Sequence, residues 1–117
     1  MPIADGLYKA QFANVSGQGS GVAHLSGGTI TGGDSVMAYI GTYEEEASVV
    51  TATVHVFRHS HVPGFLAVSG ANDVTLSFSG ALAEDGAITL AAPTPAGLMN
   101  VALTKIEQSG VEQGEGR

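Results

Sequence analysis

The 117-residue chain contains no cysteine and no tryptophan, and only 4 of its residues are Lys or Arg. Without cysteine it can form no disulfide, offers no thiolate nucleophile and cannot bind a metal or an iron–sulfur cluster through Cys ligands. Nucleic-acid affinity rests largely on basic side chains that displace counterions from phosphates, whereas here 11 acidic residues give a net charge of -7. The composition therefore argues against direct nucleic-acid binding.

Targeting signals and long hydrophobic runs are lacking as well. The first residues, Met1–Gly6, contain neither a basic stretch nor an apolar one, so no secretory signal is visible. No uninterrupted apolar run approaches the length of about 18 residues that a membrane-spanning helix needs. We therefore expect a cytoplasmic protein with no membrane partner.

Glycine, by contrast, is abundant, with 17 residues in the chain. Glycines and small polar residues recur about every eight to twelve residues, and the stretches between them follow no helical period. This spacing predicts an all-β fold, an antiparallel meander of about 7–8 strands that closes into a small barrel. The strands are expected at residues 6–14, 21–26, 29–31, 35–43, 47–59, 74–82, 87–90 and 97–106.

The length of the chain favours a single domain, which we expect over residues 1–106. The remaining residues, 107–117, have little apolar content and are predicted to form a flexible polar tail. Within the domain, only residues 63–69 could form a short helix, because Phe65 and Leu66 belong to a small apolar cluster that follows Pro63.

The interior of the predicted barrel must be built from small aliphatic side chains and a few rings. Small interior side chains can leave room in an eight-stranded barrel for one apolar ligand, and the alternative is a barrel that closes tightly around Ala and Val. The residues expected to line such a cavity are Tyr8, Phe12, Ile40, Val54 and Phe78.

The alternation predicted for residues 35–43 has a consequence for self-association. It directs Ile40 into the barrel and leaves the opposite face, with Met37, Tyr39 and Tyr43, exposed. An exposed apolar face of this kind would suit a contact between two copies of the chain.

Three histidines, His55, His59 and His61, have the same parity and would share one face of a continuous strand. Three imidazoles can hold a zinc ion. However, the opposite face, with Val54, is expected to face the core, which directs the histidines outward, and no acidic residue is close in the sequence to orient them. Solvated surface histidines are therefore the favoured interpretation, and no metal or other cofactor is predicted.

Motifs for catalysis are not found. The sequence has no phosphate-binding loop and no nucleophile elbow. The Gly32-Gly33-Asp34 sequence is interpreted as a tight turn in which the Asp34 side chain bonds its own backbone. A non-enzymatic protein is therefore expected.

The densest charge cluster is Glu44-Glu45-Glu46. Neighbouring residues on a strand point to alternate faces, so the cluster is predicted to lie on an exposed turn. It is either a solvated loop or an acidic patch that meets a basic partner protein.

Several short segments occur in a characteristic order along the chain. They are Asp5-Gly6-Leu7-Tyr8 leading into Phe12, Gly21-Val22, Thr31-Gly32-Gly33-Asp34, Tyr39-Ile40-Gly41 and Val54-His55-Val56-Phe57-Arg58. Together they resemble the GrlR family of small negative regulators of type III secretion. The resemblance is carried over residues 5–60 and is loose from there to about residue 106.

The resemblance implies a lipocalin-like up-and-down β-barrel that forms a homodimer and sequesters a transcriptional activator through protein contact. In that family an acidic surface stretch holds the activator, and Glu44, Glu45 and Glu46 fall close to it here. The match is partial, because Ala47 and Ser48 stand where acidity would continue. Two hypotheses follow: a regulator that binds a basic activator protein through these glutamates, and a lipocalin-like binder of a small apolar ligand.

Overall fold

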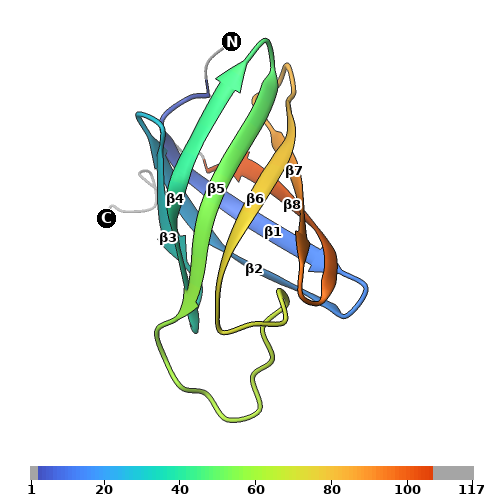
Figure 1. Cartoon of the computed structure of the whole chain (residues 1–117). Helices are drawn as coiled ribbons and strands as arrows, with labels where there is room; N and C mark the ends of the chain where they lie inside the picture. The colour runs from blue at the N-terminus through green and yellow to red at the C-terminus, as the bar shows by residue number, and fades with distance from the viewer. Residues whose placement is uncertain (1–2, 107–117) are drawn as a thin grey trace, which may run out of the picture.

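The computed structural model describes residues 3–106, which form a closed barrel of antiparallel strands (Figure 1). Each strand pairs with the next one along the chain, and the last pairs with the first, so the sheet has no free edge. The predicted all-β up-and-down barrel is therefore confirmed. The strands are β1 Gly6–Asn14, β2 Gly17–Ser26, β3 Thr29–Gly33, β4 Met37–Glu46, β5 Val49–Arg58, β6 Asp73–Leu82, β7 Ile88–Thr94 and β8 Gly97–Lys105.

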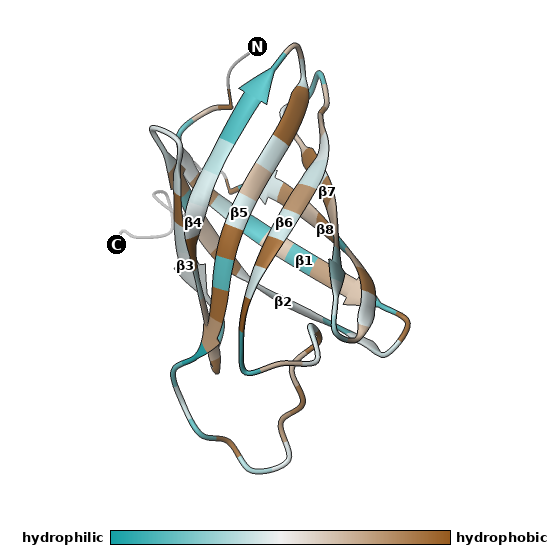
Figure 2. Ribbon diagram, viewed as in Figure 1, coloured by the Kyte–Doolittle hydropathy of each residue, from teal (hydrophilic) through white to brown (hydrophobic). Residues whose placement is uncertain are grey.

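Alternation of side chains is clearest along β5. Val50, Ala52 and Val54 are buried, whereas Thr51 and Thr53 between them are exposed. Figure 2 shows the same alternation as bands of opposite hydropathy along this strand. The period of two thus fixes which face of the strand forms the core.

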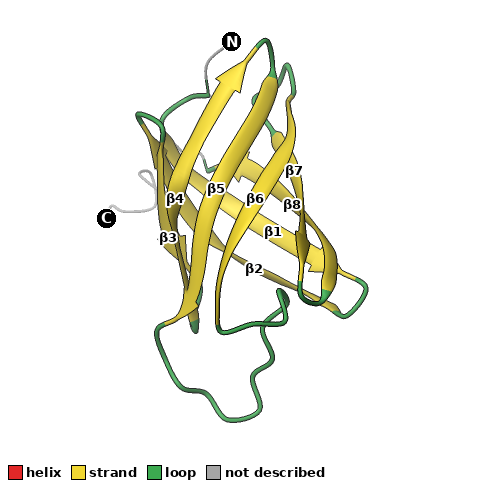
Figure 3. Ribbon diagram, in the orientation of Figure 1, coloured by secondary structure: helices red, strands yellow, loops and turns green. Residues whose placement is uncertain are grey.

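The helix predicted near residues 63–69 is wrong, because the structure has no helix in residues 3–106 (Figure 3). The chain instead forms turns closed by the amide of Phe65 on the Val62 carbonyl, 3.1 Å, and by the amide of Gly70 on the Ala67 carbonyl, 2.9 Å. Gly64 has a φ of 82°, in the left-handed region that a right-handed helix cannot include. None of the described residues forms a helix long and apolar enough to cross a membrane.

The predicted facing of β4 is also wrong. Ile40 is 51% exposed on the outside of the barrel, whereas Met37 is 4% exposed and Tyr39 and Tyr43 pack against the core. The cause lies before the strand, where Val36 and Met37 are consecutive and both buried. When inward and outward positions are assigned by alternation from Val36, every residue of β4 is assigned to the wrong face. This is because an error of one residue exchanges the two faces of a strand. The residues expected to form an exposed dimer face thus point inward.

The glutamates also lie elsewhere than predicted, because Glu44, Glu45 and Glu46 are the last residues of β4. The turn that follows consists of Ala47 and Ser48, with φ values of 54° and 70°. Such two-residue hairpin turns usually contain Asn or Gly, so the sequence here carries no signal for the turn.

The two ends of the barrel differ in how they are covered. One end, the closed end, has the tight turns at residues 27–28, 47–48 and 83–87 together with the segment of residues 3–5 (Figure 1). Its interior holds the largest of the fully buried side chains, namely Tyr8, Leu25, Val50 and Ile88, each at most 1% exposed. The other end, the loop end, has the turns at residues 15–16, 34–36 and 95–96 and the long loop of residues 59–72 (Figure 1). The tail predicted at residues 107–117 lies outside the described residues.

Candidate functional site

A cavity of about 250 Å³ lies inside the barrel and extends from the loop end past the middle as far as Leu25 and Ile30. All eight strands contribute to its wall, and the 59–72 loop contributes its roof. The lining is mainly apolar, and its aliphatic and aromatic members on the strands are Ala10, Phe12, Ala23, Leu25, Ile30, Met37, Tyr39, Val54, Val56, Phe78, Leu90, Met99, Val101 and Leu103.

Small residues on the inner face of β2 leave this space unfilled. A Cβ atom at Gly19 would lie 2.6 Å from the ring of Phe12, and one at Gly21 would lie 2.8 Å from the hydroxyl of Tyr39. The two rings can therefore lie against β2 only because glycine stands at both positions. The inner face of β2 carries no side chain larger than that of Ala23 between Gly19 and Leu25. The barrel is therefore hollow beside the two rings.

The roof of the cavity is formed by the side chains of Phe65–Val68, in the 59–72 loop. Two hydrogen bonds join this part of the loop to neighbouring turns of the loop end. The Asn14 side-chain amide donates to the Val68 carbonyl at 2.6 Å, and the Ala96 amide donates to the Ser69 carbonyl at 3.2 Å. The roof is thus attached to two turns that are remote from it in the sequence.

Arg58 holds the first half of the same loop. Its guanidinium donates to the carbonyl oxygens of Ser60, 3.3 Å, and Phe65, 3.4 Å, and lies 5.1 Å from the centre of the Phe65 ring. The charge of Arg58 is therefore directed at the loop backbone, and Arg58 is not among the residues that line the cavity.

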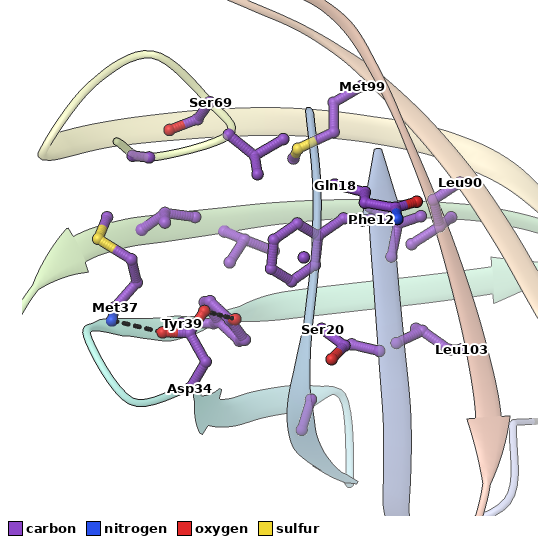
Figure 4. A pocket seen from close by; sticks show the side chains of 18 of the residues that line it. Phe12, Gln18, Ser20, Asp34, Met37, Tyr39, Ser69, Leu90, Met99 and Leu103 are labelled. Carbon is purple, nitrogen blue, oxygen red and sulfur yellow. Dashed lines mark hydrogen bonds between the residues drawn. The ribbon is translucent and has the colours of Figure 1, made fainter. Parts of the chain in front are cut away.

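The charged group of the cavity wall is the carboxylate of Asp34, and the lining also includes the neutral polar residues Gln18, Ser20, Ser35 and Ser69. One oxygen, Oδ1, accepts the amide N–H groups of Val36 at 2.9 Å and Met37 at 2.7 Å, which confirms that the Asp34 side chain bonds its own turn. The turn begins later than predicted, because Gly32 and Gly33 belong to β3. The other oxygen, Oδ2, accepts the hydroxyl of Tyr39 at 2.6 Å (Figure 4). The ring of Tyr39 also meets Phe12 edge to face, with 6.1 Å between the ring centres.

Burial raises the pKa of the Tyr39 phenol well above its usual value of 10.0, and the hydrogen bond to Asp34 acts in the same direction. The phenol therefore keeps its proton at neutral pH and donates it in a hydrogen bond to the Asp34 carboxylate. Near this pair, His59 Nε2 lies 2.9 Å from the main-chain oxygen of Asp34 and so connects the 59–72 loop to the same turn.

Three of the five residues expected to line a cavity do so, namely Phe12, Val54 and Phe78. Tyr8 is buried at the closed end, outside the lining, and its hydroxyl donates to the Ala4 carbonyl at 2.7 Å. Ile40 lies on the outer face.

Sequence reasoning missed the Asp34–Tyr39 pair as part of a site, and it missed the roof. The turn at Asp34 was signalled by the glycine pair before it, but the inward position of Tyr39 had no local signal. The apolar cluster that includes Phe65 was visible in the sequence, and the structure places it over the cavity mouth.

The three glutamates are not all on one surface. Glu44 and Glu46 are exposed on the outer face of β4, whereas Glu45 has the opposite parity and is half-buried. A Glu45 carboxylate oxygen accepts the Ser48 amide N–H at 2.8 Å and so stabilises the hairpin turn.

Two of the three histidines, His55 and His59, have separate hydrogen-bond partners. His55 Nε2 lies 2.8 Å from Oδ1 of Asp73 on the neighbouring strand, an acidic partner that the local sequence does not reveal. His59 contacts Asp34 and, through Nδ1, the Ser60 hydroxyl at 2.7 Å. Within residues 3–106 no group of three ligating side chains comes together that could hold a metal ion.

Comparison of the chain with known protein families gives no match, and comparison with curated proteins gives none either. The geometry of the cavity and its roof therefore carries the functional argument.

Proposed function

We propose that the protein is a non-enzymatic binder of a small, mainly apolar molecule that occupies the cavity at the loop end. The observation that carries this proposal is the cavity itself, about 250 Å³ of space between the rings of Phe12 and Tyr39 and the roof at Phe65–Val68. Ligand pockets for drug-sized molecules have volumes of about 300–1,000 Å³, so the ligand expected here is smaller than a drug.

The physical basis of binding is the apolar wall. Apolar surface that is removed from water contributes about 25 cal/mol per Å² to binding, and this wall surrounds the ligand from every strand. Access is expected through the roof, where Leu66 lines the cavity and is nevertheless 87% exposed. A shift of this loop would open the cavity without separating any pair of strands.

The proposal can be tested by titrating ¹⁵N-labelled protein with n-octanol and following amide chemical shifts. Binding in the cavity should shift the amides of Phe12, Tyr39 and Val68, and it should leave that of Val50 at the closed end unchanged. The variant Ala10→Ile adds a larger side chain to the cavity wall and should abolish these shifts.

The matched control is Ala81→Ile, which makes the same chemical change at an exposed position on the outer face of β6. It should bind n-octanol like the wild type. If n-octanol shifts no lining amide of the wild type, or if Ala10→Ile binds it equally well, the cavity is not a ligand site.

A second candidate function is the one that the resemblance to the GrlR family implies, a cytoplasmic homodimer that sequesters a basic activator protein. The observation that favours it is the exposure of Glu44 and Glu46 side by side on the outer face of β4. Acidic side chains in such a position would attract a basic surface and raise the rate of association.

Capture of a partner from a lysate of the native cells tests this candidate. The double variant Glu44→Gln/Glu46→Gln should lose the partner, whereas Glu45→Gln should keep it because Glu45 faces the other way. Equal capture by all three proteins would rule out the outer face of β4 as the binding surface.

A further inference from the structure

The charged side chains that line the cavity are of one sign only. Its described lining includes one carboxylate, that of Asp34, and no Lys, Arg or His side chain. Arg58, the last residue of β5, is directed at the carbonyl groups of the loop backbone. A ligand with a negatively charged end would therefore meet a carboxylate and no compensating charge.

The Asp34 carboxylate has more hydrogen-bond acceptor sites than its protein partners occupy. A carboxylate offers about four lone-pair sites, two on each oxygen. Oδ1 already accepts two amide N–H groups, from Val36 and Met37, and Oδ2 accepts one hydroxyl, from Tyr39. One acceptor site on Oδ2 is left over.

The Tyr39 hydroxyl is likewise reduced to an acceptor. Its proton is committed to Asp34 at 2.6 Å, so only the lone pairs of the phenol oxygen remain for other groups. Both polar groups that the pair can still offer to a ligand are acceptors, and they lie on one wall of the cavity (Figure 4).

We propose that the ligand is an amphiphile whose polar end is a hydrogen-bond donor, above all a protonated amine, and that Asp34 and Tyr39 bind this end. Its apolar part lies against Phe12 and the roof at Phe65–Val68. This inference rests on the proposed binding function and adds the chemical class of the ligand. Amphiphilic carboxylates are disfavoured by the same geometry.

A comparison with Asp85 separates this role from a purely structural one. Asp85 also holds a turn, because its Oδ1 accepts the Ala87 amide at 3.0 Å, and it is exposed on the outside of the closed end. The turn at Asp34 likewise needs only one carboxylate oxygen. The second oxygen of Asp34, with Tyr39, is therefore additional to the turn and lies on the wall of the cavity.

The test measures the affinity of three probes of equal chain length at pH 7 by calorimetry: n-octylamine, n-octanol and n-octanoate. At this pH the amine is protonated and the carboxylate is ionised. Charge-assisted hydrogen bonds are about twice as strong as neutral ones, so the wild type should bind the amine at least about tenfold more tightly than octanoate, with octanol between them.

Two variants test whether Asp34 and Tyr39 cause the preference for the amine over octanoate. In Asp34→Asn the side-chain oxygen can still hold the turn, while the amide N–H can donate to Tyr39 and release the phenol proton toward the cavity. The preference for amine over octanoate should then be lost or reversed. Tyr39→Phe keeps the ring against Phe12 and should reduce the preference by a smaller factor, and the control Asp85→Asn should retain it.

The outcomes distinguish the inference from the function on which it rests. If octanol binds in the cavity but the wild type shows no preference for the amine, or if Asp34→Asn keeps that preference, the inference fails and the binding function stands. If none of the three probes binds, both fail. Thermal unfolding of each variant shows whether it is folded, and Tyr39→Phe supplies the comparison should Asp34→Asn not fold.

Discussion

The closed end and the loop end of the barrel are built from the same strands, yet one is filled and the other is hollow. At the closed end, Tyr8, Val50 and Ile88 are each at most 1% exposed, and none of them lines the cavity. At the loop end, the inner face of β2 consists of Gly19 and Gly21, and β5 is connected to β6 by the long 59–72 loop rather than by a tight turn. The difference indicates that the closed end supplies most of the packing energy, which allows the loop end to keep a cavity.

Tyr8 at the closed end and Tyr39 at the loop end both point inward, and they differ in their hydrogen-bond partners. The Tyr8 hydroxyl donates to a main-chain carbonyl, that of Ala4, whereas the Tyr39 hydroxyl donates to the Asp34 carboxylate. A main-chain partner fixes the segment of residues 3–5 over the closed end. A carboxylate partner leaves charge and spare acceptors at the cavity wall, which is a feature of a binding site rather than of a core.

The largest expected effect comes from truncating one isoleucine that is remote from the cavity and one that lines it. Ile88 is fully buried at the closed end, and Ile30 borders the cavity. Ile88→Ala should lower the free energy of unfolding by about 4 kcal/mol and Ile30→Ala by about 2 kcal/mol, since a side chain beside a cavity has fewer contacts to lose. Urea denaturation of both variants measures the difference, and equal losses would contradict the comparison.

A second substitution addresses the glycine that admits Tyr39. A Cβ atom at Gly21 would lie 2.7 Å from the Gly33 carbonyl oxygen and 2.8 Å from the Tyr39 hydroxyl, so both must move. Gly21→Ala should therefore cost about 1–3 kcal/mol of stability and should displace the Tyr39 ring, visible as altered aromatic NMR signals.

The control for this substitution is Gly17→Ala, because an added Cβ there meets nothing within 4 Å. Its stability should stay within about 0.5 kcal/mol of the wild type. If the two variants are equally stable, the close approach at Gly21 has no energetic consequence.

The two tyrosines provide a comparison by pH. Burial raises the pKa of Tyr8 and of Tyr39 above the ordinary value of 10.0. Above about pH 10 the unfolded chain releases these protons and the folded chain retains them, so stability is fully present below that pH and falls as the pH rises. Each group contributes a slope of at most about 1.4 kcal/mol per pH unit.

Tyr8→Phe and Tyr39→Phe should each make the stability loss between about pH 10 and pH 12 shallower, as measured by urea denaturation over this range. Tyr8→Phe should in addition lose about 1 kcal/mol at neutral pH, because the Ala4 carbonyl loses its donor. A variant with the wild-type slope would show that the replaced tyrosine ionises in the folded protein as it does in the unfolded one.

The sequence predicted the barrel well because the information for it is local. The strict alternation of β5 and the glycine pair of the 27–28 turn are readable over a few residues, and signals of this kind predicted about 7–8 antiparallel strands in chain order. The pair Gly32-Gly33 was misread as a turn, because it ends β3. The turn at Asp34 was predictable for the same reason, since an Asp side chain bonds amides two or three residues ahead.

The errors arose where local pattern and tertiary packing disagree. Val36 and Met37 are both buried because the chain turns there, which hid the inward position of Tyr39. The turn of Ala47 and Ser48 contains none of the residues that usually mark a hairpin, so the adjoining glutamates were placed on a loop. The cavity was anticipated only as a general property of small barrels, since its roof depends on contacts between remote residues.

The smallest predicted effect concerns the attachment of that roof, through Asn14. Its side-chain oxygen accepts the amides of Ser16, 2.8 Å, and Gly17, 3.1 Å, while its side-chain nitrogen donates to the Val68 carbonyl. Asn14→Asp keeps the acceptor for the turn and removes the donor to the loop. The loss of one such hydrogen bond is worth about 1 kcal/mol, which should make amide exchange in the loop at most about tenfold faster.

Hydrogen exchange monitored by NMR tests this at the amides of Phe65 and Gly70, which close the turns of the 59–72 loop. These two should exchange faster in Asn14→Asp, and those beside Val50 and Ile88 should be unchanged. Faster exchange throughout the barrel would mean that the bond stabilises the whole fold, and the two ends would then not be independent. Faster exchange in the loop alone, with quicker entry of n-octanol, would establish the roof as the part that opens, because the bond from Asn14 to Val68 is one of the two that attach it to neighbouring turns.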